Sequence, residues 1–169
     1  MKNNIMYVFI LSIIIFFLSE TSPYSKSSIQ WHSFNSGLVK AKKLARPVVI
    51  DFYAKWCTWC KVMDKKTFSD EKVIEKMNRD YVAVKVNMES NETIYYKNRK
   101  MSPNQFSRFL GIQGLPSFLF MDKNGEIIMK ISGFKEPKVF SAILGYVRDG
   151  CYKKNVPFMD YMNGKVDCK

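Results

Sequence analysis

Runs of apolar residues alternate with segments of helical period along most of the chain. Short runs rich in β-branched and aromatic residues predict strands, at 29–34, 47–54, 81–87 and, as a hairpin around Asp122–Gly125, at 117–132. Apolar positions three and four residues apart predict helices, at 35–45, 60–68, 69–80, 102–111 and 136–150. The polar stretch 88–101 has no period and predicts a surface loop. This order predicts an α/β fold with a central mixed β-sheet flanked by helices.

Two of the predicted helices carry more detailed signals. The helix at 35–45 has a single apolar face, formed by Leu38, Ala41 and Leu44 or Ala45. The helix at 102–111 begins with Ser102 as N-cap and Pro103 in the first turn, and Gln105 completes a capping box.

The strand at 47–54 leads directly into two cysteines. Its near-continuous apolar run is typical of a central strand covered on both faces, so its one charged residue, Asp51, requires an explanation. Cys57 and Cys60 follow where a helix begins, and free backbone N–H groups and the helix dipole there favour a thiolate at Cys57. A thiolate attacks a disulfide to form a mixed disulfide, which Cys60, one turn later, is placed to resolve.

Other uses of a cysteine pair at this spacing fit the chain less well. A zinc site needs four ligands, but the chain offers one Cys-x-x-Cys pair, one histidine (His32) and two distant cysteines. A c-type haem attachment needs a histidine at the position of Lys61. A purely structural disulfide between Cys57 and Cys60 would close a ring too small to constrain the unfolded chain strongly. We therefore interpret the pair as a redox dithiol.

Residues 1–24 predict a signal peptide or an N-terminal membrane anchor. The uncharged apolar run at 5–18 has 14 residues, which suits a signal sequence and is short for a membrane-spanning helix of about 20 residues. Ser19 and Thr21 are small enough to precede a cleavage site. Cleavage and retention both place the following domain outside the cytoplasm, in the periplasm, where disulfides persist.

The formal net charge of +12 comes from 27 basic and 15 acidic residues. The lysines are scattered, and arginine, the residue suited to phosphate and guanine contacts, supplies only five of the positive charges. We therefore expect a solvated lysine surface and no nucleic-acid partner. Attraction of acidic partners or of a membrane surface is the remaining role for this charge.

The segment VVIDFYAKWCTWCK resembles the active-site segment of thioredoxins. Asp51 matches the buried aspartate of that family, which assists proton transfer from the second cysteine, and Lys85 matches the lysine beside it. A capping aspartate and an edge-strand lysine are the plainer interpretations. The segment GIQGLPSFLF matches the family's proline loop, which implies that Pro116 is cis and that Leu115 offers backbone hydrogen bonds to a substrate chain.

More narrowly, residues 31–162 resemble extracytoplasmic thioredoxin-related proteins of the SoxW type and the C-terminal domain of membrane thiol:disulfide interchange proteins. The chain departs from cytosolic thioredoxin in having Thr58 and Trp59 between the cysteines and an inserted loop and helix before the proline. Thr58 and Trp59 should tune the redox potential and, with Trp56, form a substrate-docking surface. Local packing is the alternative role of the two tryptophans.

This resemblance implies an enzyme, a thiol:disulfide oxidoreductase of thioredoxin-like fold without a cofactor other than its redox-active disulfide, and without a metal. Cys57 would be the nucleophile and Cys60 the resolving thiol, Asp51 the proton acceptor and Lys85 its modulator. The substrates would be oxidised or mixed-disulfide proteins outside the cytoplasm, and a membrane thiol donor would supply electrons. Strong oxidants of this fold often carry histidine between the cysteines, where this chain has Thr58 and Trp59, so we expect a reductase of disulfides in these proteins. The alternatives are an oxidant or isomerase, or a non-catalytic binding or chaperone module.

The predicted domain boundaries divide the chain into a leader, one thioredoxin-like domain and a C-terminal extension, at 1–24, 29–150 and 151–169. Cys151 and Cys168 flank the extension. A structural disulfide that pins this tail is the interpretation we favour, with free thiols or a second redox relay as alternatives.

Overall fold

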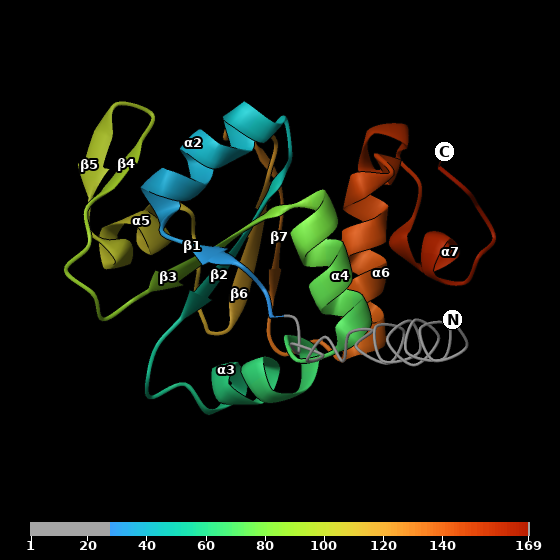
Figure 1. The fold of residues 1–169 in the computed structure, drawn as a ribbon, viewed down its shortest axis with the longest axis horizontal. Coiled ribbons are helices and arrows are strands. Elements are labelled where there is room, and N and C mark those ends of the chain that lie inside the picture. The colour runs from blue at the N-terminus through green and yellow to red at the C-terminus, as the bar shows by residue number, and fades with distance from the viewer. Residues whose placement is uncertain (1–27, 169) are drawn as a thin grey trace, which may run out of the picture.

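A five-stranded sheet forms the centre of the protein, and two short strands form a separate hairpin (Figure 1). The computed structural model describes residues 28–168, so the predicted leader lies outside the described residues. The sheet order is β1-β3-β2-β6-β7; the first three are parallel, and β6 and β7 are each antiparallel to the strand before. The strands are β1 (Trp31–His32), β2 (Val48–Tyr53), β3 (Val82–Asn87), β4 (Ile94–Tyr96), β5 (Arg99–Met101), β6 (Ser117–Met121) and β7 (Ile127–Ser132).

Helices cover both faces of this sheet, so the predicted architecture is confirmed (Figure 1). The helical segments are α2 (Phe34–Leu44), α3 (Thr58–Val62), the π turn η1 (Met63–Thr67), α4 (Glu71–Asp80), α5 (Pro103–Phe109), α6 (Pro137–Arg148), the 3-10 turn η2 (Cys151–Lys154) and α7 (Phe158–Met162). The helices α2 and α5 pack on one face and α4 and α6 on the other, while α3 lies at one end of the sheet. Within residues 28–168, no helix combines the length and the apolar character needed to cross a membrane.

β2 is the central strand, as its apolar run predicts. It pairs in parallel with β3 and antiparallel with β6, so both of its edges are hydrogen-bonded. Val48, Ile50 and Phe52 pack in the cluster that includes α2, and Val49 packs in the cluster that includes α4 and α6. Because side chains alternate along a strand, Asp51 shares the face of Val49. A carboxyl group is thereby placed in the interior of the protein.

The buried face of α2 differs from the predicted one. Phe34, Gly37 and Ala41 are buried, whereas Leu44 and Ala45 are exposed. A Cβ atom at Gly37 would lie 2.3 Å from a methyl group of β3, so the helix approaches the sheet more closely than any side chain would allow. The bulky ring of Phe34 and the absence of a side chain at Gly37 together turn this face toward the sheet. The prediction was correct at Ala41 and wrong at the C-terminal end.

The stretch 88–101, which was predicted as a loop, contains the β4–β5 hairpin. Ile94 and Tyr96 are buried, and the Tyr96 ring packs edge-on against aromatic rings of α2 and α5. Lys97 and Asn98 both have positive φ angles, of 46° and 62°, which is the geometry of a tight hairpin turn. A glycine-free turn between two strands of three residues leaves little periodic signal, and the loop prediction is therefore wrong.

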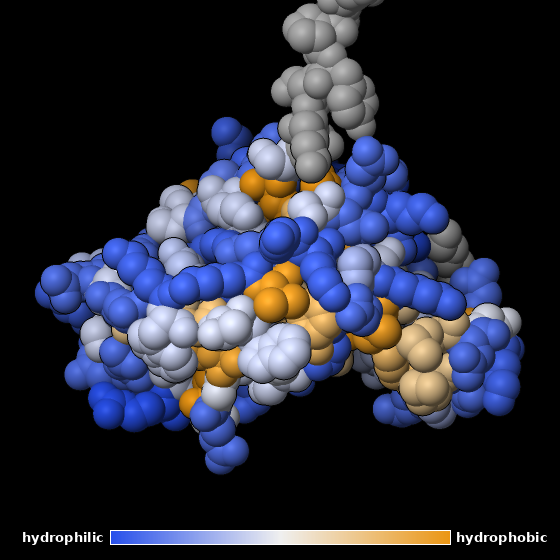
Figure 2. Space-filling model, turned by 90° about the horizontal axis from the view of Figure 1, so that it is seen from below, coloured by the Kyte–Doolittle hydropathy of each residue, from blue (hydrophilic) through white to orange (hydrophobic). Residues whose placement is uncertain are grey.

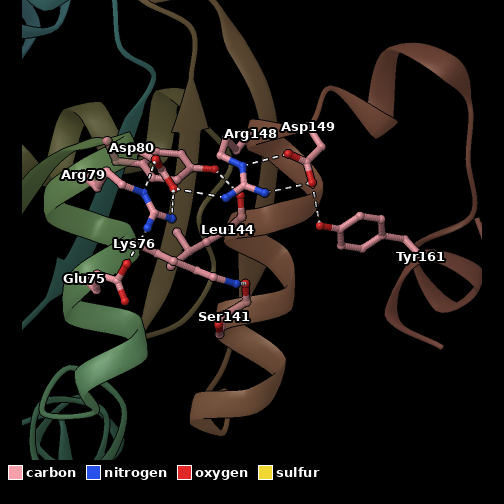
Figure 3. Close-up of polar contacts among 10 residues, drawn as sticks. Glu75, Lys76, Arg79, Asp80, Ser141, Leu144, Arg148, Asp149 and Tyr161 are labelled. Carbon is pink, nitrogen blue, oxygen red and sulfur yellow. Dashed lines mark hydrogen bonds and ion pairs between the residues drawn. The ribbon is translucent and has the colours of Figure 1, made fainter. Parts of the chain in front are cut away.

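The C-terminal extension folds back on α6. Cys151 and Cys168 are bonded to each other and both are buried. The Tyr161 ring of α7 packs edge-on against a tyrosine of α6, and its hydroxyl donates a hydrogen bond to Asp149 (2.9 Å). Arg148 binds the same Asp149 and a carboxylate of α4, so a chain of polar contacts joins α4, α6 and α7 (Figure 3).

Replacement of both Cys151 and Cys168 with alanine should lower the free energy of unfolding by about 3 kcal/mol, because the disulfide closes a loop of 17 residues. Urea unfolding under non-reducing conditions measures this change. The midpoint potential of the Cys57–Cys60 couple should stay unchanged in the same variant, because its sulfurs lie in a separate cluster. An unfolding free energy equal to that of the unaltered protein would contradict a structural role for this disulfide.

Candidate active site

The two cysteines that follow β2 form a disulfide at the start of α3. Cys57 is the N-cap residue of α3, and its Sγ accepts a hydrogen bond from the backbone N–H of Cys60 (3.0 Å). The two sulfurs are bonded, with Cα atoms 5.3 Å apart. Both side chains are nearly fully buried, in a small cluster with Ala54 and Tyr53. In the reduced form, the same N–H group is placed to stabilise a thiolate on Cys57.

The loop before β6 brings Leu115 against this disulfide. Leu115 packs on the cluster of Cys57 and Cys60, and the Leu115–Pro116 peptide bond is cis. The Pro116 carbonyl accepts a hydrogen bond from the backbone N–H of Gly133 (2.8 Å), which fastens this loop to the end of β7. The N–H and C=O groups of Leu115 make no hydrogen bond to any residue within 28–168. A partner chain in extended conformation can therefore pair with them.

Asp51 is a buried carboxyl group on β2. Its side chain is 3% exposed, and its Oδ1 has no hydrogen-bond partner in the described part of the chain. Its Oδ2 lies 3.7 Å from Nζ of Lys85, an ion-pair distance longer than a hydrogen bond. Burial raises the pKa of Asp51 from 3.8 to about 7; the charge of Lys85 opposes this rise, and the charge of Asp64 adds to it. Near neutral pH this carboxyl group can therefore take up or release a proton.

Lys85 is shared between two carboxylates. Its Nζ lies 2.5 Å from Oδ1 of Asp64 and also lies over the rings of Trp31 and Tyr53, at 4.9 and 5.0 Å from their centroids. Asp64 belongs to η1, where the predicted continuous helix instead widens into a π turn. Sequence reasoning missed Asp64, since its only local signal is an acidic residue about one turn after Cys60. Only the tertiary contact with Lys85 connects it to the site.

Two tryptophans flank the disulfide at the surface. Trp56 and Trp59 are 69% and 57% exposed, and Thr58 between the cysteines is exposed as well. Trp59 stacks on Phe134, with ring centroids 5.7 Å apart. Trp56 borders a groove of about 270 Å³ that lies between α5 and the loop before β6 and is also lined by Leu115. Figure 2 shows the face on the side of α3, where orange and white atoms are exposed among blue side chains.

The other residues considered from sequence lie apart from the redox pair. Cys151 and Cys168 pack in the hydrophobic cluster of α4 and α6, which does not include Cys57. His32 lies in β1, with its Nε2 atom 2.9 Å from Nζ of Lys40. Among residues 28–168, no group of three histidine, cysteine or carboxylate side chains is placed to hold a metal ion.

Residues 34–148 match the model of the thioredoxin-like domain family. Relatives include the thiol:disulfide interchange protein DsbD of Escherichia coli (strain K12), which is 35% identical over 112 residues, covering 65% of this chain and 18% of that protein. DsbD of Campylobacter jejuni (strain RM1221) is 38% identical over 89 residues, covering 53% of this chain and 14% of that protein. The chain therefore matches less than a fifth of the length of these relatives.

Solved structures share the fold at lower identity. A thioredoxin-fold protein from Helicobacter pylori superposes with a TM-score of 0.63 at 18% identity, covering 84% of this chain and 90% of that one. A thioredoxin from Thermus thermophilus gives a TM-score of 0.61 at 23% identity, covering 76% and 91% of the two chains. With its family match over residues 34–148, the chain belongs to the thioredoxin-like domain family.

Proposed function

We propose that the protein is an exported reductase that transfers two electrons from the Cys57–Cys60 dithiol to disulfides of other proteins outside the cytoplasm. One observation carries this proposal: the disulfide lies against Leu115, whose backbone groups make no hydrogen bond within residues 28–168 and are oriented by an anchored loop. A substrate chain that pairs with Leu115 as an added strand would present its own disulfide to Cys57. The dithiol is itself the redox group, and the reaction needs no other cofactor.

In the first step, the Cys57 thiolate attacks one sulfur of the substrate disulfide. The substrate S–S bond breaks, its second sulfur leaves as a thiolate, and a mixed disulfide forms between Cys57 and the substrate. The N–H of Cys60, which already donates to the Cys57 sulfur, stabilises the attacking thiolate.

In the second step, Cys60 attacks Cys57 and releases the substrate. Its sulfur loses a proton and forms the Cys57–Cys60 bond as the mixed disulfide breaks, so the reduced substrate leaves with both electrons. Asp51 is the proposed proton acceptor, because its pKa of about 7 suits proton exchange near neutral pH. Lys85 and Asp64 adjust that pKa in opposite directions.

The direction and the location of this reaction are inferred from sequence. The dipeptide Thr58-Trp59 lacks the histidine that stabilises the reduced form of strong oxidants of this fold, which favours reduction of substrates. Residues 1–24 support export or membrane anchoring. Each turnover leaves the Cys57–Cys60 pair oxidised, so we assign its reduction to a thiol donor in the membrane. The thiol:disulfide interchange function in the name of the DsbD relatives is consistent with such a transfer.

A Cys60→Ala variant should accumulate a mixed disulfide with a protein substrate such as insulin, because the intermediate on Cys57 can no longer be resolved. Mass spectrometry after acid quenching detects this species. The matched Cys57→Ala variant should form none and should reduce insulin no faster than the dithiothreitol control. Full activity of Cys57→Ala would instead favour a non-catalytic binding module, and oxidation of reduced ribonuclease faster than reduction of insulin would favour an oxidant or isomerase.

Asp51→Asn should stabilise the oxidised protein at pH 8, by on the order of 4 kcal/mol, and the gain should disappear near pH 4. The folded-state pKa of Asp51, about 7, exceeds its ordinary value of 3.8. The folded protein therefore binds the extra proton between these values, and stability falls as the pH rises from about 4 to 7. At pH 8, above this pKa, the buried carboxyl group carries most of its charge. Urea unfolding of both proteins at several pH values measures the difference.

Asp64→Asn provides the matched comparison for this prediction. The substitution removes the negative charge of Asp64, which raises the pKa of Asp51, and leaves Lys85 with a single carboxylate partner. The pH at which the fall in the free energy of unfolding is complete should therefore be lower in the Asp64→Asn variant. A constant stability difference between the unaltered protein and Asp51→Asn across pH 4–8 would show that Asp51 does not titrate with a raised pKa.

A further inference from the structure

We propose that the surface around the Cys57–Cys60 disulfide selects protein partners that carry acidic side chains beside the target cysteine. This inference rests on the proposed function and names the class of substrate. It concerns five side chains, here called the basic belt: Lys55, Lys61, Lys65, Lys66 and Arg108. The charge of these residues and the groove that Arg108 lines supply the argument.

Lysines of the basic belt precede and follow the cysteine pair along the chain, and two belt residues lie near the flanking tryptophans in space. Lys55 precedes Trp56, and Lys61 follows Cys60 directly. Lys65 lies one turn beyond Lys61, and all five side chains are exposed. The Nζ atom of Lys66 lies 6.0 Å from the centroid of the Phe134 ring, on which Trp59 stacks, and Arg108 of α5 lines the groove beside Trp56.

None of the five belt residues forms an ion pair with another residue of the described chain. Elsewhere some basic side chains are paired, such as Arg79 with Glu75 and Arg148 with Asp149, whereas others, such as Lys42 and Lys123, form no ion pair within the described residues. The positive charges of the belt are therefore available to a partner, and their place beside the disulfide and the groove distinguishes them from the other unpaired lysines.

Acidic side chains near the belt are few and already engaged. Asp51 is buried, and Asp64 is held by Lys85. Glu89 accepts a hydrogen bond from the backbone N–H of Lys55 (2.5 Å) and is the one exposed carboxylate among these three without a cationic partner. The five belt cations thus outnumber these three carboxylates, and a net positive surface attracts negative charge.

The groove defines what kind of partner this charge would recognise. Its apolar wall comes from Trp56, Met88, Ile112 and Leu115, its one charged side chain is Arg108, and no carboxylate lines it. An extended chain hydrogen-bonded to the free backbone of Leu115 could place an apolar side chain in the groove and an acidic side chain beside Arg108. A concave groove with free backbone groups fits a polypeptide better than a membrane surface, which offers no N–H or C=O groups to pair in register.

The test compares reduction of three disulfide peptides by the reduced full-length protein. The peptides differ only in the residues that flank each cysteine, which are glutamate, glutamine or lysine. Second-order rate constants come from acid quenching and chromatography, at about 10 mM and 500 mM salt. Hydroxyethyl disulfide, which is uncharged, serves as the reference for the intrinsic reactivity of Cys57. We expect the glutamate peptide to react at least about tenfold faster than the lysine peptide at low salt, with most of this ratio lost at high salt.

Two double charge-reversal variants show which lysines cause the faster reaction of the glutamate peptide. The Lys61→Glu/Lys65→Glu variant should bring the glutamate-to-lysine ratio to one or below, after normalisation to hydroxyethyl disulfide. The matched Lys42→Glu/Lys123→Glu variant makes the same change of charge on exposed residues of α2 and the β6–β7 turn, and should retain the ratio. Both variants have equal net charge, so a difference between them reports position.

Three outcomes would overturn the proposal. Equal rates for the three peptides would leave the reductase function intact and remove the charge selection. An equal effect of the two charge-reversal pairs would assign the ratio to net charge alone. Binding of the protein to phosphatidylglycerol vesicles that Lys61→Glu/Lys65→Glu abolishes, with no change in the peptide ratio, would assign the belt to a membrane surface. Failure of hydroxyethyl disulfide itself to react would instead contradict the proposed function.

Discussion

The whole fold is organised around β2, which lies between β3 and β6. Both edges of this strand are hydrogen-bonded and both of its faces are covered, so its register with its neighbours is fixed. The pairing of Asp51 with Lys85 across β2 and β3 follows from that register. The same strand ends four residues before Cys57, and the Leu115–Pro116 loop leads into β6 beside it. The Cys57–Cys60 disulfide, the buried Asp51 and the Leu115–Pro116 loop are thus held together by one buried strand.

The electrostatics of the site follow from the cost of burying Asp51. Desolvation of this carboxyl outweighs the attraction of Lys85, whose Nζ is 3.7 Å away and is shared with Asp64. A closer and exclusive Lys85 partner would hold Asp51 ionised and make it a weaker base. The arrangement instead leaves a carboxyl group that exchanges protons near neutral pH, which the resolving step of the proposed reaction requires. In this account, stability is sacrificed at one residue to support chemistry at the neighbouring cysteines.

Local signals allowed much of the fold to be predicted from sequence, and tertiary contacts explain what was missed. The capping box at Ser102 and Gln105, the central apolar strand and the β6–β7 hairpin are encoded within a few residues, and the structure contains each of them. The β4–β5 hairpin was missed because its strands are short and its turn at Lys97 and Asn98 lacks glycine.

The residues of the candidate site also fall into two groups: those that local sequence signals identify and those that only tertiary contacts reveal. Cys57 and Cys60 stand out by spacing, and Asp51 stands out as the one charge in an apolar run. Asp64 could not be found in this way, because its connection to Lys85 depends on the π turn after α3 and on a strand more than twenty residues later. The groove beside Trp56 could not be predicted either, because it forms only where α5 and the loop before β6 lie next to this side chain.

The midpoint potential of the Cys57–Cys60 couple distinguishes a reductase from an oxidant. The protein is equilibrated with mixtures of reduced and oxidised glutathione at pH 7, and the reduced fraction is measured by mass after alkylation of free thiols. A reducing dithiol predicts a value close to that of thioredoxin, about −270 mV. A value near about −120 mV, roughly 7 kcal/mol away for a two-electron couple, would contradict the reductase account and identify an oxidant. The absence of any reversible couple would contradict redox catalysis at this pair altogether.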